Sequence, residues 1–284
     1  MNQGIHYIDM LQFLVGPVAE VTGHCGTFGH TGLAVEDTAA AAIKFQSGAL
    51  GVVEGTTCAY PGLVSRIDVY GTEGSAVIEN DVRLGAMGER WKGSARGVND
   101  FVFLAIGTGI AAGICVNGEL LRGPGFAAGE VGYLIVPGTR EDAVPEGHPG
   151  ALESAIGGEG IRAQWKNGTQ RMYGEALYDL SATDIFERAT NGNEQAQSVL
   201  ERSARILAHT IYDISVVLNC PLFILGGGVG MSVILRDATE SILKKYSQPV
   251  RPQLRLSSLG PDAQLFGALR LALDAAEKKI GLKM

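Results

Sequence analysis

The sequence lacks the cysteine spacing of disulfide-rich and zinc-binding proteins. Its four cysteines, Cys25, Cys58, Cys115 and Cys220, lie far apart and form no C-x-x-C motif. This spacing argues against both a disulfide framework and a metal site. It favours buried free thiols in a reducing compartment, and therefore a cytoplasmic location.

Positive charge is also scarce. The formal net charge is −7, and no basic stripe is available to neutralise phosphates, so a nucleic-acid partner is not expected. Residues 1–78 contain two basic residues, Lys44 and Arg66, against seven acidic ones, whereas residues 79–284 contain 21 against 23. This shift predicts two segments of different origin.

A membrane-spanning segment is not expected either. The uncharged run from Ile214 to Leu235 is long enough to cross a bilayer, but Asn219, Pro221 and three consecutive glycines would break a membrane helix. No basic residue precedes Lys44, so a signal peptide is not expected.

What is present indicates a globular α/β protein. The 284 residues are 46% hydrophobic and 19% charged, enough for one large domain or two ordinary ones. Forty glycines suit a protein whose backbone closely approaches small ligands.

The first 80 residues predict one helix and an antiparallel sheet. Residues 2–15 have helical apolar spacing and end at Gly16-Pro17. Short glycine-bearing turns then separate four or five strand-like stretches, which favours antiparallel pairing. These stretches are residues 19–28, 37–45, 48–57, 65–72 and 75–79.

The rhythm of the sequence changes after residue 80. The pattern predicts a helix, two strands with an Asn117-Gly118 turn in the second, and then mainly helices with two further strands. The predicted helices are residues 81–92, about 151–166, 193–218, one after the triple glycine, and one from Asp262. The predicted strands are 101–109, 111–121, 221–228 and about 253–259.

Two glycine turns suggest ligand binding. Gly107, Gly109 and Ala112 match a G-x-G-x-x-A dinucleotide fingerprint, but a strand follows where that motif needs a helix. The turn remains either a plain hairpin or a small anion-binding nest. The second turn, within "ILGGGVGMS", joins a strand to a helix and would let a flat or anionic ligand approach.

The polar candidates each have a structural alternative. Asn80 and Asp81 are either helix N-caps or, for Asp81, a catalytic base. Glu153 lies just inside a helix start, where a glutamate often only complements the helix dipole. Glu130 lies among small residues in "AAGEVGY". His6, alone in an amphipathic helix, is more typical of a packed or surface histidine.

From Glu79 to about Ala276 the chain resembles the ROK family of sugar kinases and sugar-responsive repressors. The resemblance rests on "ENDVRLGAMGE", "VFLAIGTGIAAGICVNGELLRGPGFAAGEVG", "GALE", "FILGGGV" and "LFGALRLAL". It implies a partial actin-like ATPase fold, with Asp81 as the base for a sugar hydroxyl and Asn80, Glu130 and Glu153 as sugar ligands. It also implies nucleotide-binding turns at Gly107, Thr108, Gly109, Gly226, Gly227 and Gly228, with ATP and Mg²⁺ as cofactors.

The chain also departs from that family. The first phosphate loop, Asp-x-Gly-Gly-Thr, is missing from the sequence. Tyr133 replaces the family's histidine after Gly132, which removes a sugar ligand and a zinc ligand. The family's zinc-binding cysteines are replaced by "PEGHPGALE", so zinc is not expected.

Residues 2–78 resemble instead part of the C-terminal domain of Gfo/Idh/MocA oxidoreductases. The matching pieces are "NQGIHYIDMLQFLVGPVAEV", "VEDTAAAAIKFQSGALGVVEGTTCAYPG" and "RIDVYGTEGSAVIE". The resemblance places His6 beside a substrate, with Asn2 where many relatives carry aspartate. The nicotinamide-binding domain and its Glu-Lys-Pro motif are missing, so NAD(P) is not expected. The sheet face of this family often mediates association, and a homo-oligomer is expected.

The sequence therefore predicts an α/β and α+β protein with two parts, residues 1–78 and 79–284. The expected function is ATP-dependent phosphorylation of a hexose or N-acetylhexosamine, with transfer weak or absent and sugar binding retained. Three alternatives remain open: a non-catalytic sugar-responsive regulator, a remnant of an NAD(P)-dependent sugar oxidoreductase, and an inactive chimera. No helix-turn-helix pattern precedes the ROK-like part, so DNA binding is not expected.

Overall fold

The computed structural model describes residues 2–29, 35–56, 58, 67–72, 75–77, 79–123, 127–142, 148–173, 180–247 and 251–280. The chain forms two compact units. The first consists of Met1–Glu79 with Pro124–Ala127, and the second of Asn80–Gly123 with Ala128–Met284.

The first unit combines one helix with antiparallel strands. Helix α1 (Asn2–Val15) precedes a sheet of order β1-β2-β3 and a two-stranded ribbon, β4-β5. Alternation explains the sheet, because Ile43 and Phe45 of β2 are buried while Lys44 between them is exposed. The strands are β1 (Val18–Gly26), β2 (Thr38–Phe45), β3 (Leu50–Thr56), β4 (Asp68–Tyr70) and β5 (Ser75–Val77).

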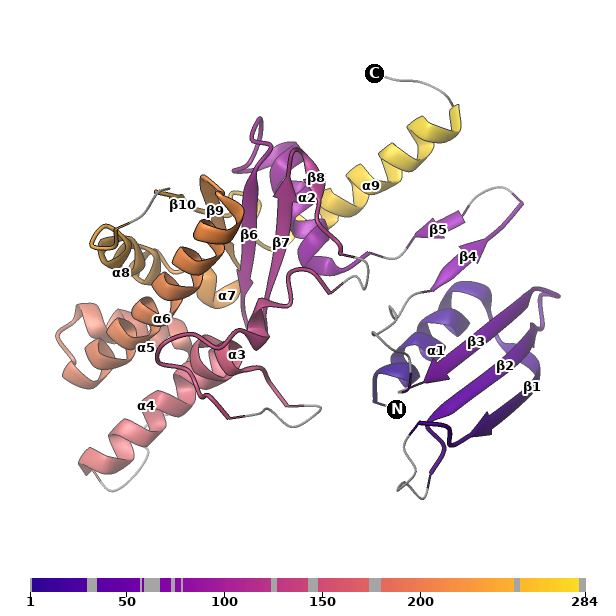
Figure 1. Ribbon diagram of the computed structural model, residues 1–284, viewed down its shortest axis with the longest axis horizontal. Coiled ribbons are helices and arrows are strands. Elements are labelled where there is room, and N and C mark those ends of the chain that lie inside the picture. Colours follow the sequence, from indigo (N-terminus) through magenta and orange to yellow (C-terminus); the bar gives the residue numbers. More distant parts are fainter. Residues whose placement is uncertain are drawn as a thin grey trace. The chain divides into compact units, whose positions relative to one another are not determined.

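The second unit is built on a five-stranded sheet of order β10-β9-β6-β7-β8 (Figure 1). The neighbours β10, β9 and β6 are parallel, and β6, β7 and β8 are antiparallel. Strands β6 and β9 are apolar and almost wholly buried along their length, as expected for strands covered on both faces. The strands are β6 (Phe101–Ile106), β7 (Ile110–Val116), β8 (Glu119–Leu120), β9 (Leu222–Gly226) and β10 (Gln253–Leu256).

Helices surround this sheet. Helix α2 (Asp81–Lys92) packs on β6 and β7 and lies alongside α9 (Ala263–Ile280) (Figure 1). The long helix α6 begins at the N-cap Asn193 and ends at Asn219, which adopts a left-handed conformation. The remaining helices are η1 (Val131–Tyr133), α3 (Ala151–Ile156), α4 (Gly158–Tyr173), α5 (Ala182–Thr190), α6 (Glu194–Leu218), α7 (Gly227–Gly230), α8 (Val233–Leu243) and η2 (Gly260–Asp262).

The structure confirms the predicted mixed α/β class and differs in two helices. The predicted helix 151–166 is two helices that meet at Gly157. Helix α5 was not predicted, although Ser181 and Asp184 form a capping box at its start. The side-chain hydrogen bond from Ser181 holds the pKa of Asp184 below its usual range. In the described part of the chain, no helix is long and apolar enough to cross a membrane.

The cysteines only partly follow the prediction of buried thiols. Cys25, Cys115 and Cys220 are free thiols, and Cys115 and Cys220 are buried, whereas Cys25 is exposed and Cys58 is half-buried. The prediction is therefore wrong for Cys25 and Cys58. Cys25 lies in β1 of a three-stranded sheet, and its side chain is not covered.

Alkylation is expected to separate these thiols. Burial raises the pKa of the Cys115 and Cys220 thiols and also blocks access to them. Iodoacetamide at pH 8 is expected to modify Cys25 at least about tenfold faster than Cys115 or Cys220, as measured by peptide mass spectrometry. Equal rates for the three in the folded protein would contradict the burial of the two slow thiols.

Candidate functional site

Two glycine turns lie next to each other at one edge of the second unit's sheet. Strands β6 and β9 are parallel neighbours with Ala105 opposite Gly226, so the turns that follow them leave the sheet on the same side. Gly227 has φ +78°, and a Cβ there would lie 2.5 Å from the carbonyl oxygen of Ile106, so only glycine fits. A Cβ at Gly107 or Gly228 would meet no atom within 4 Å, which leaves their backbone open to a ligand.

A third glycine turn, between α3 and α4, packs against the first. The N–H of Gly158 donates to the carbonyl of Gly107 at 2.8 Å. A Cβ at Gly157 would lie 2.9 Å from the carbonyl oxygen of Thr108. Thr108 and Gly109 are exposed. The three turns form an open backbone surface that suits a flat or anionic ligand. This third turn was not predicted, although "GGEG" within the predicted helix 151–166 is a signal for it.

Glu153 is fixed by strand β7. It lies in the first turn of α3, whose N-cap Gly150 makes no side-chain cap. Its Oε2 accepts a 2.9 Å hydrogen bond from the N–H of Ile110 at the start of β7. A Cβ at Gly109 would lie only 3.0 Å from the same oxygen. The carboxylate is therefore bonded across to the strand that follows the first glycine turn.

Glu130 stands at a turn held by the same strand. The N–H of Ala112 in β7 donates to the carbonyl of Gly129 at 2.7 Å. Gly129 has φ +100°, and a Cβ there would overlap the carbonyl oxygen of Ala112. Glu130 follows directly, is exposed, and precedes η1. Tyr133, the residue that replaces the family's histidine, is also exposed.

Asn80 and Asp81 form the N-terminus of α2. Asn80 Oδ1 accepts from the N–H groups of Val82 at 3.0 Å and Arg83 at 3.2 Å, so Asn80 is the N-cap. Asp81 is exposed, and its Oδ1 accepts from Val82 N–H at 2.8 Å. A Cβ at Gly113 of β7 would lie 2.8 Å from the carbonyl oxygen of Val82, so the first turn of α2 packs directly on this strand.

Strand β7 thus brings the predicted site residues of the second unit to neighbouring positions. Glu153 is bonded at Ile110, the Glu130 turn at Ala112, and the first turn of α2 at Gly113. These contact points span about 10 Å of strand, since a strand rises about 3.3 Å per residue. The buried Arg83 joins two of these pieces, because its Nη2 donates to the carbonyl of Ala128 at 3.4 Å. No sequence signal pointed to Arg83.

The two candidates of the first unit do not belong to this site. Asn2 and His6 belong to α1 of the first unit, and their side chains lie outside the described residues. Across the described ranges, no group of three or more His, Cys, Asp or Glu side chains is placed to hold a metal ion. Another histidine of the second unit, His209, stacks on Tyr246 with ring centroids 5.4 Å apart.

The fold and these turns define a class of protein. The sheet, with glycine turns after its adjacent parallel strands β6 and β9, has the actin-like ATPase fold of ROK sugar kinases. Residues 62–275 match the ROK family, and the chain belongs to that family. Residues 1–77 match the GFO/IDH/MocA C-terminal domain. Both predicted resemblances are therefore confirmed.

A curated relative is the N-acetylmannosamine kinase of Escherichia fergusonii. It is 33% identical over 193 residues, which cover 68% of this chain and 63% of that protein. The chain thus spans less than two thirds of the length of the relative.

Two solved structures share the fold. A ROK family glucokinase from Streptomyces griseus, in complex with glucose and AMPPNP, has a TM-score of 0.58 at 19% identity and covers 89% of this chain and 99% of its own. A ROK family transcriptional regulator, a homologue of the E. coli MLC protein, has a TM-score of 0.59 at 20% identity and covers 82% of this chain and 74% of its own.

Proposed function

We propose that the chain binds a hexose or an N-acetylhexosamine at the carboxylates of Glu130 and Glu153 beside β7 and retains a weak ROK-type phosphotransferase site. One observation carries the proposal: strand β7 contacts Glu153, the Glu130 turn and the first turn of α2. Kinase names among the relatives support the same reaction class.

In this proposal each polar side chain has a role. Asp81 accepts the proton of the attacking sugar hydroxyl, while Asn80, Glu130 and Glu153 orient the sugar. Carboxylate oxygens are strong acceptors for sugar hydroxyls, and positioning supplies much of the rate of phosphoryl transfer. Asn80 is the N-cap of α2, which holds its side chain at the start of that helix beside Asp81.

The cofactor proposed is ATP with Mg²⁺, which supplies the transferred phosphoryl group when bound. The open backbone at Gly107 and Gly228 fits a nucleotide, because a Cβ at either position meets no atom. The residues proposed to hold it are Gly107, Thr108, Gly109, Gly226, Gly227 and Gly228. The missing Asp-x-Gly-Gly-Thr loop removes part of the usual phosphate contacts, which is why transfer is proposed to be weak.

An ADP-release assay with Mg-ATP tests this function directly. The sugars are glucose, mannose, N-acetylglucosamine and N-acetylmannosamine, and at least one is expected to give turnover above the sugar-free rate. If none of the four sugars gives turnover but sugars shift the melting temperature, a second candidate is favoured, a non-catalytic sugar-responsive protein. That candidate is favoured by the fold shared with the MLC-type regulator.

Gly129→Ala is expected to weaken sugar binding at least about tenfold. The added methyl group overlaps the Ala112 carbonyl and moves Glu130, and a lost hydrogen bond to a charged group costs about 1.5–3 kcal/mol. Gly192→Ala is the matched control, because Gly192 has φ +86° but a Cβ there meets nothing within 4 Å. Calorimetry compares the two variants, and equal losses of affinity would contradict the role of the Glu130 turn.

We also propose that the first unit mediates self-association. Leu50 and Val52 of β3 are 81% and 80% exposed on one sheet face. Val52→Lys is expected to shift the light-scattering mass of the chain toward the monomer, and an unchanged oligomeric mass would contradict this surface.

A further inference from the structure

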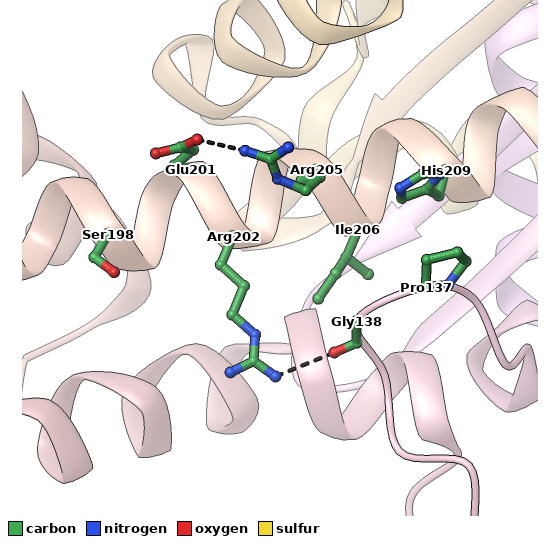
Figure 2. Close-up of a pocket in the computed structure, with 8 residues that line it drawn as sticks. All are labelled: Pro137, Gly138, Ser198, Glu201, Arg202, Arg205, Ile206 and His209. Carbon is green, nitrogen blue, oxygen red and sulfur yellow. Dashed lines mark hydrogen bonds and ion pairs between the residues drawn. The ribbon is translucent and has the colours of Figure 1, made fainter. Parts of the chain in front are cut away.

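A hollow of about 370 Å³ lies between α6 and the turn at Pro137–Gly138, within the second unit (Figure 2). It shares no lining residue with the carboxylates or the glycine turns of the proposed kinase site. Its volume is within the range of pockets that bind small molecules. The residues lining it are Pro137, Gly138, Ser198, Glu201, Arg202, Arg205, Ile206 and His209.

The helix supplies most of the lining from one face. Ser198, Arg202 and His209 recur at near-helical spacing, with Ile206 as an apolar neighbour. Arg202 reaches across the hollow toward the turn, and its Nη2 donates to the carbonyl of Gly138 at 3.1 Å (Figure 2). This bond fixes the guanidinium at the pocket while leaving most of its five N–H donors for other acceptors.

The charge of the lining is positive. Two arginines of the lining, Arg202 and Arg205, stand against a single carboxylate, Glu201. Arg205 pairs with Glu201 on the solvent side, where their side chains are 56% and 67% exposed. An exposed pair of this kind is weak, so Arg205 can exchange Glu201 for a stronger anionic partner at little cost. The lining therefore carries a formal excess of one positive charge, in a chain whose formal net charge is −7.

We propose that this hollow binds a phosphate dianion, either inorganic phosphate or the phosphate of a phosphorylated sugar. The planar guanidinium fork matches the geometry of phosphate oxygens better than that of an uncharged sugar. The Ser198 hydroxyl, one helical turn from Arg202, adds a donor for the phosphate, and Ile206, one turn further along α6, offers an apolar wall to the carbon skeleton of a sugar phosphate. The proposal goes beyond the kinase function and does not depend on it.

Calorimetry on the full chain without nucleotide tests the site, with inorganic phosphate, mannose 6-phosphate and mannose as probes. Both phosphates are expected to bind, and Arg202→Ala is expected to weaken each at least about tenfold, the loss expected for a hydrogen bond to a charged group. Lys244→Ala is the matched control, since it removes one exposed cation of a helical ion pair outside the hollow. Arg202→Lys keeps the charge and loses the fork, and an intermediate affinity is expected.

Glu201→Gln provides a test in the opposite direction. It releases Arg205 and removes the one carboxylate, so phosphate affinity is expected to rise, by up to about fivefold. Tighter binding of mannose 6-phosphate than of inorganic phosphate would identify a phosphorylated sugar as the ligand, and the reverse order would identify free phosphate. Absence of phosphate binding, or equal losses in Arg202→Ala and Lys244→Ala, would overturn the proposal. Glu153→Ala, which is expected to weaken sugar binding at the kinase site, is expected to leave inorganic phosphate affinity unchanged, and this difference separates the two sites.

Discussion

Asparagine in place of Asp81 is expected to lower phosphoryl transfer at least about 100-fold, the usual contribution of a positioned general base. Val82 N–H donates a 2.8 Å hydrogen bond to Asp81, and the asparagine amide keeps an oxygen that can accept it. The N-cap is contributed by Asn80, so the start of α2 is expected to persist. The variant therefore removes the proton acceptor while keeping the geometry of the turn, and sugar affinity is expected to change less than about threefold.

Two readouts are needed for this variant. Transfer of labelled phosphate over long incubations measures the rate, and calorimetry measures sugar affinity. Asp237→Asn is a matched control, because it removes a carboxylate from an exposed ion pair on α8 and leaves the site intact. Unchanged turnover in Asp81→Asn would show that Asp81 is only a residue of the helix terminus.

Glu89→Ala is expected to destabilise the second unit by at least about 3 kcal/mol, since each stranded buried donor costs about 1–3 kcal/mol. Glu89 is fully buried near the C-terminal end of α2. Its carboxylate accepts from Ser94 N–H at 2.6 Å, from Leu259 N–H at 3.2 Å and from the Ser257 hydroxyl. Truncation leaves all three donors unsatisfied and loosens the segment between β10 and α9 from α2.

Tryptophan fluorescence measures this effect in the second unit alone. Both tryptophans of the chain, Trp91 and Trp165, belong to that unit. Urea unfolding of Glu89→Ala is compared with that of Glu187→Ala, which removes an exposed glutamate of α5 and is expected to change stability by less than about 0.5 kcal/mol. Glu89→Gln retains one acceptor oxygen, and an intermediate loss is expected. A midpoint for Glu89→Ala equal to that of Glu187→Ala would contradict the bridging role.

Local patterns in the sequence predicted much of the fold. Residues 37–45 were predicted as a strand-like stretch followed by a short glycine-bearing turn, and β2 lies there and pairs antiparallel with β3. The Asn-Gly pair at 117–118 predicted a turn, and β7 and β8 meet there. Helix α5 is short and was missed, although Ala182, Ile185, Phe186 and Ala189 recur at helical spacing and Ser181 begins a capping box.

The assembly of the site was beyond local patterns. The hydrogen bond that Ile110 donates to Glu153 joins residues 43 positions apart, and the one that Ser257 donates to Glu89 joins residues 168 positions apart. Strand β9 pairs with β6 although most of the second unit's sequence lies between them, and periodicity does not predict such a pairing. The candidate site residues came from the resemblance to the ROK family, because a family pattern contains long-range arrangement that composition and spacing do not.

Isothermal titration calorimetry of the full chain with glucose and with N-acetylmannosamine, each with and without Mg-ATP, tests the central claim that β7 holds a sugar site. We expect saturable binding of about one sugar per chain for at least one of the two sugars, with or without nucleotide. Glu153→Ala is expected to weaken this binding at least about tenfold, through loss of a charge-assisted hydrogen bond. Absence of saturable heat with both sugars, or binding that Glu153→Ala leaves unchanged, would contradict it.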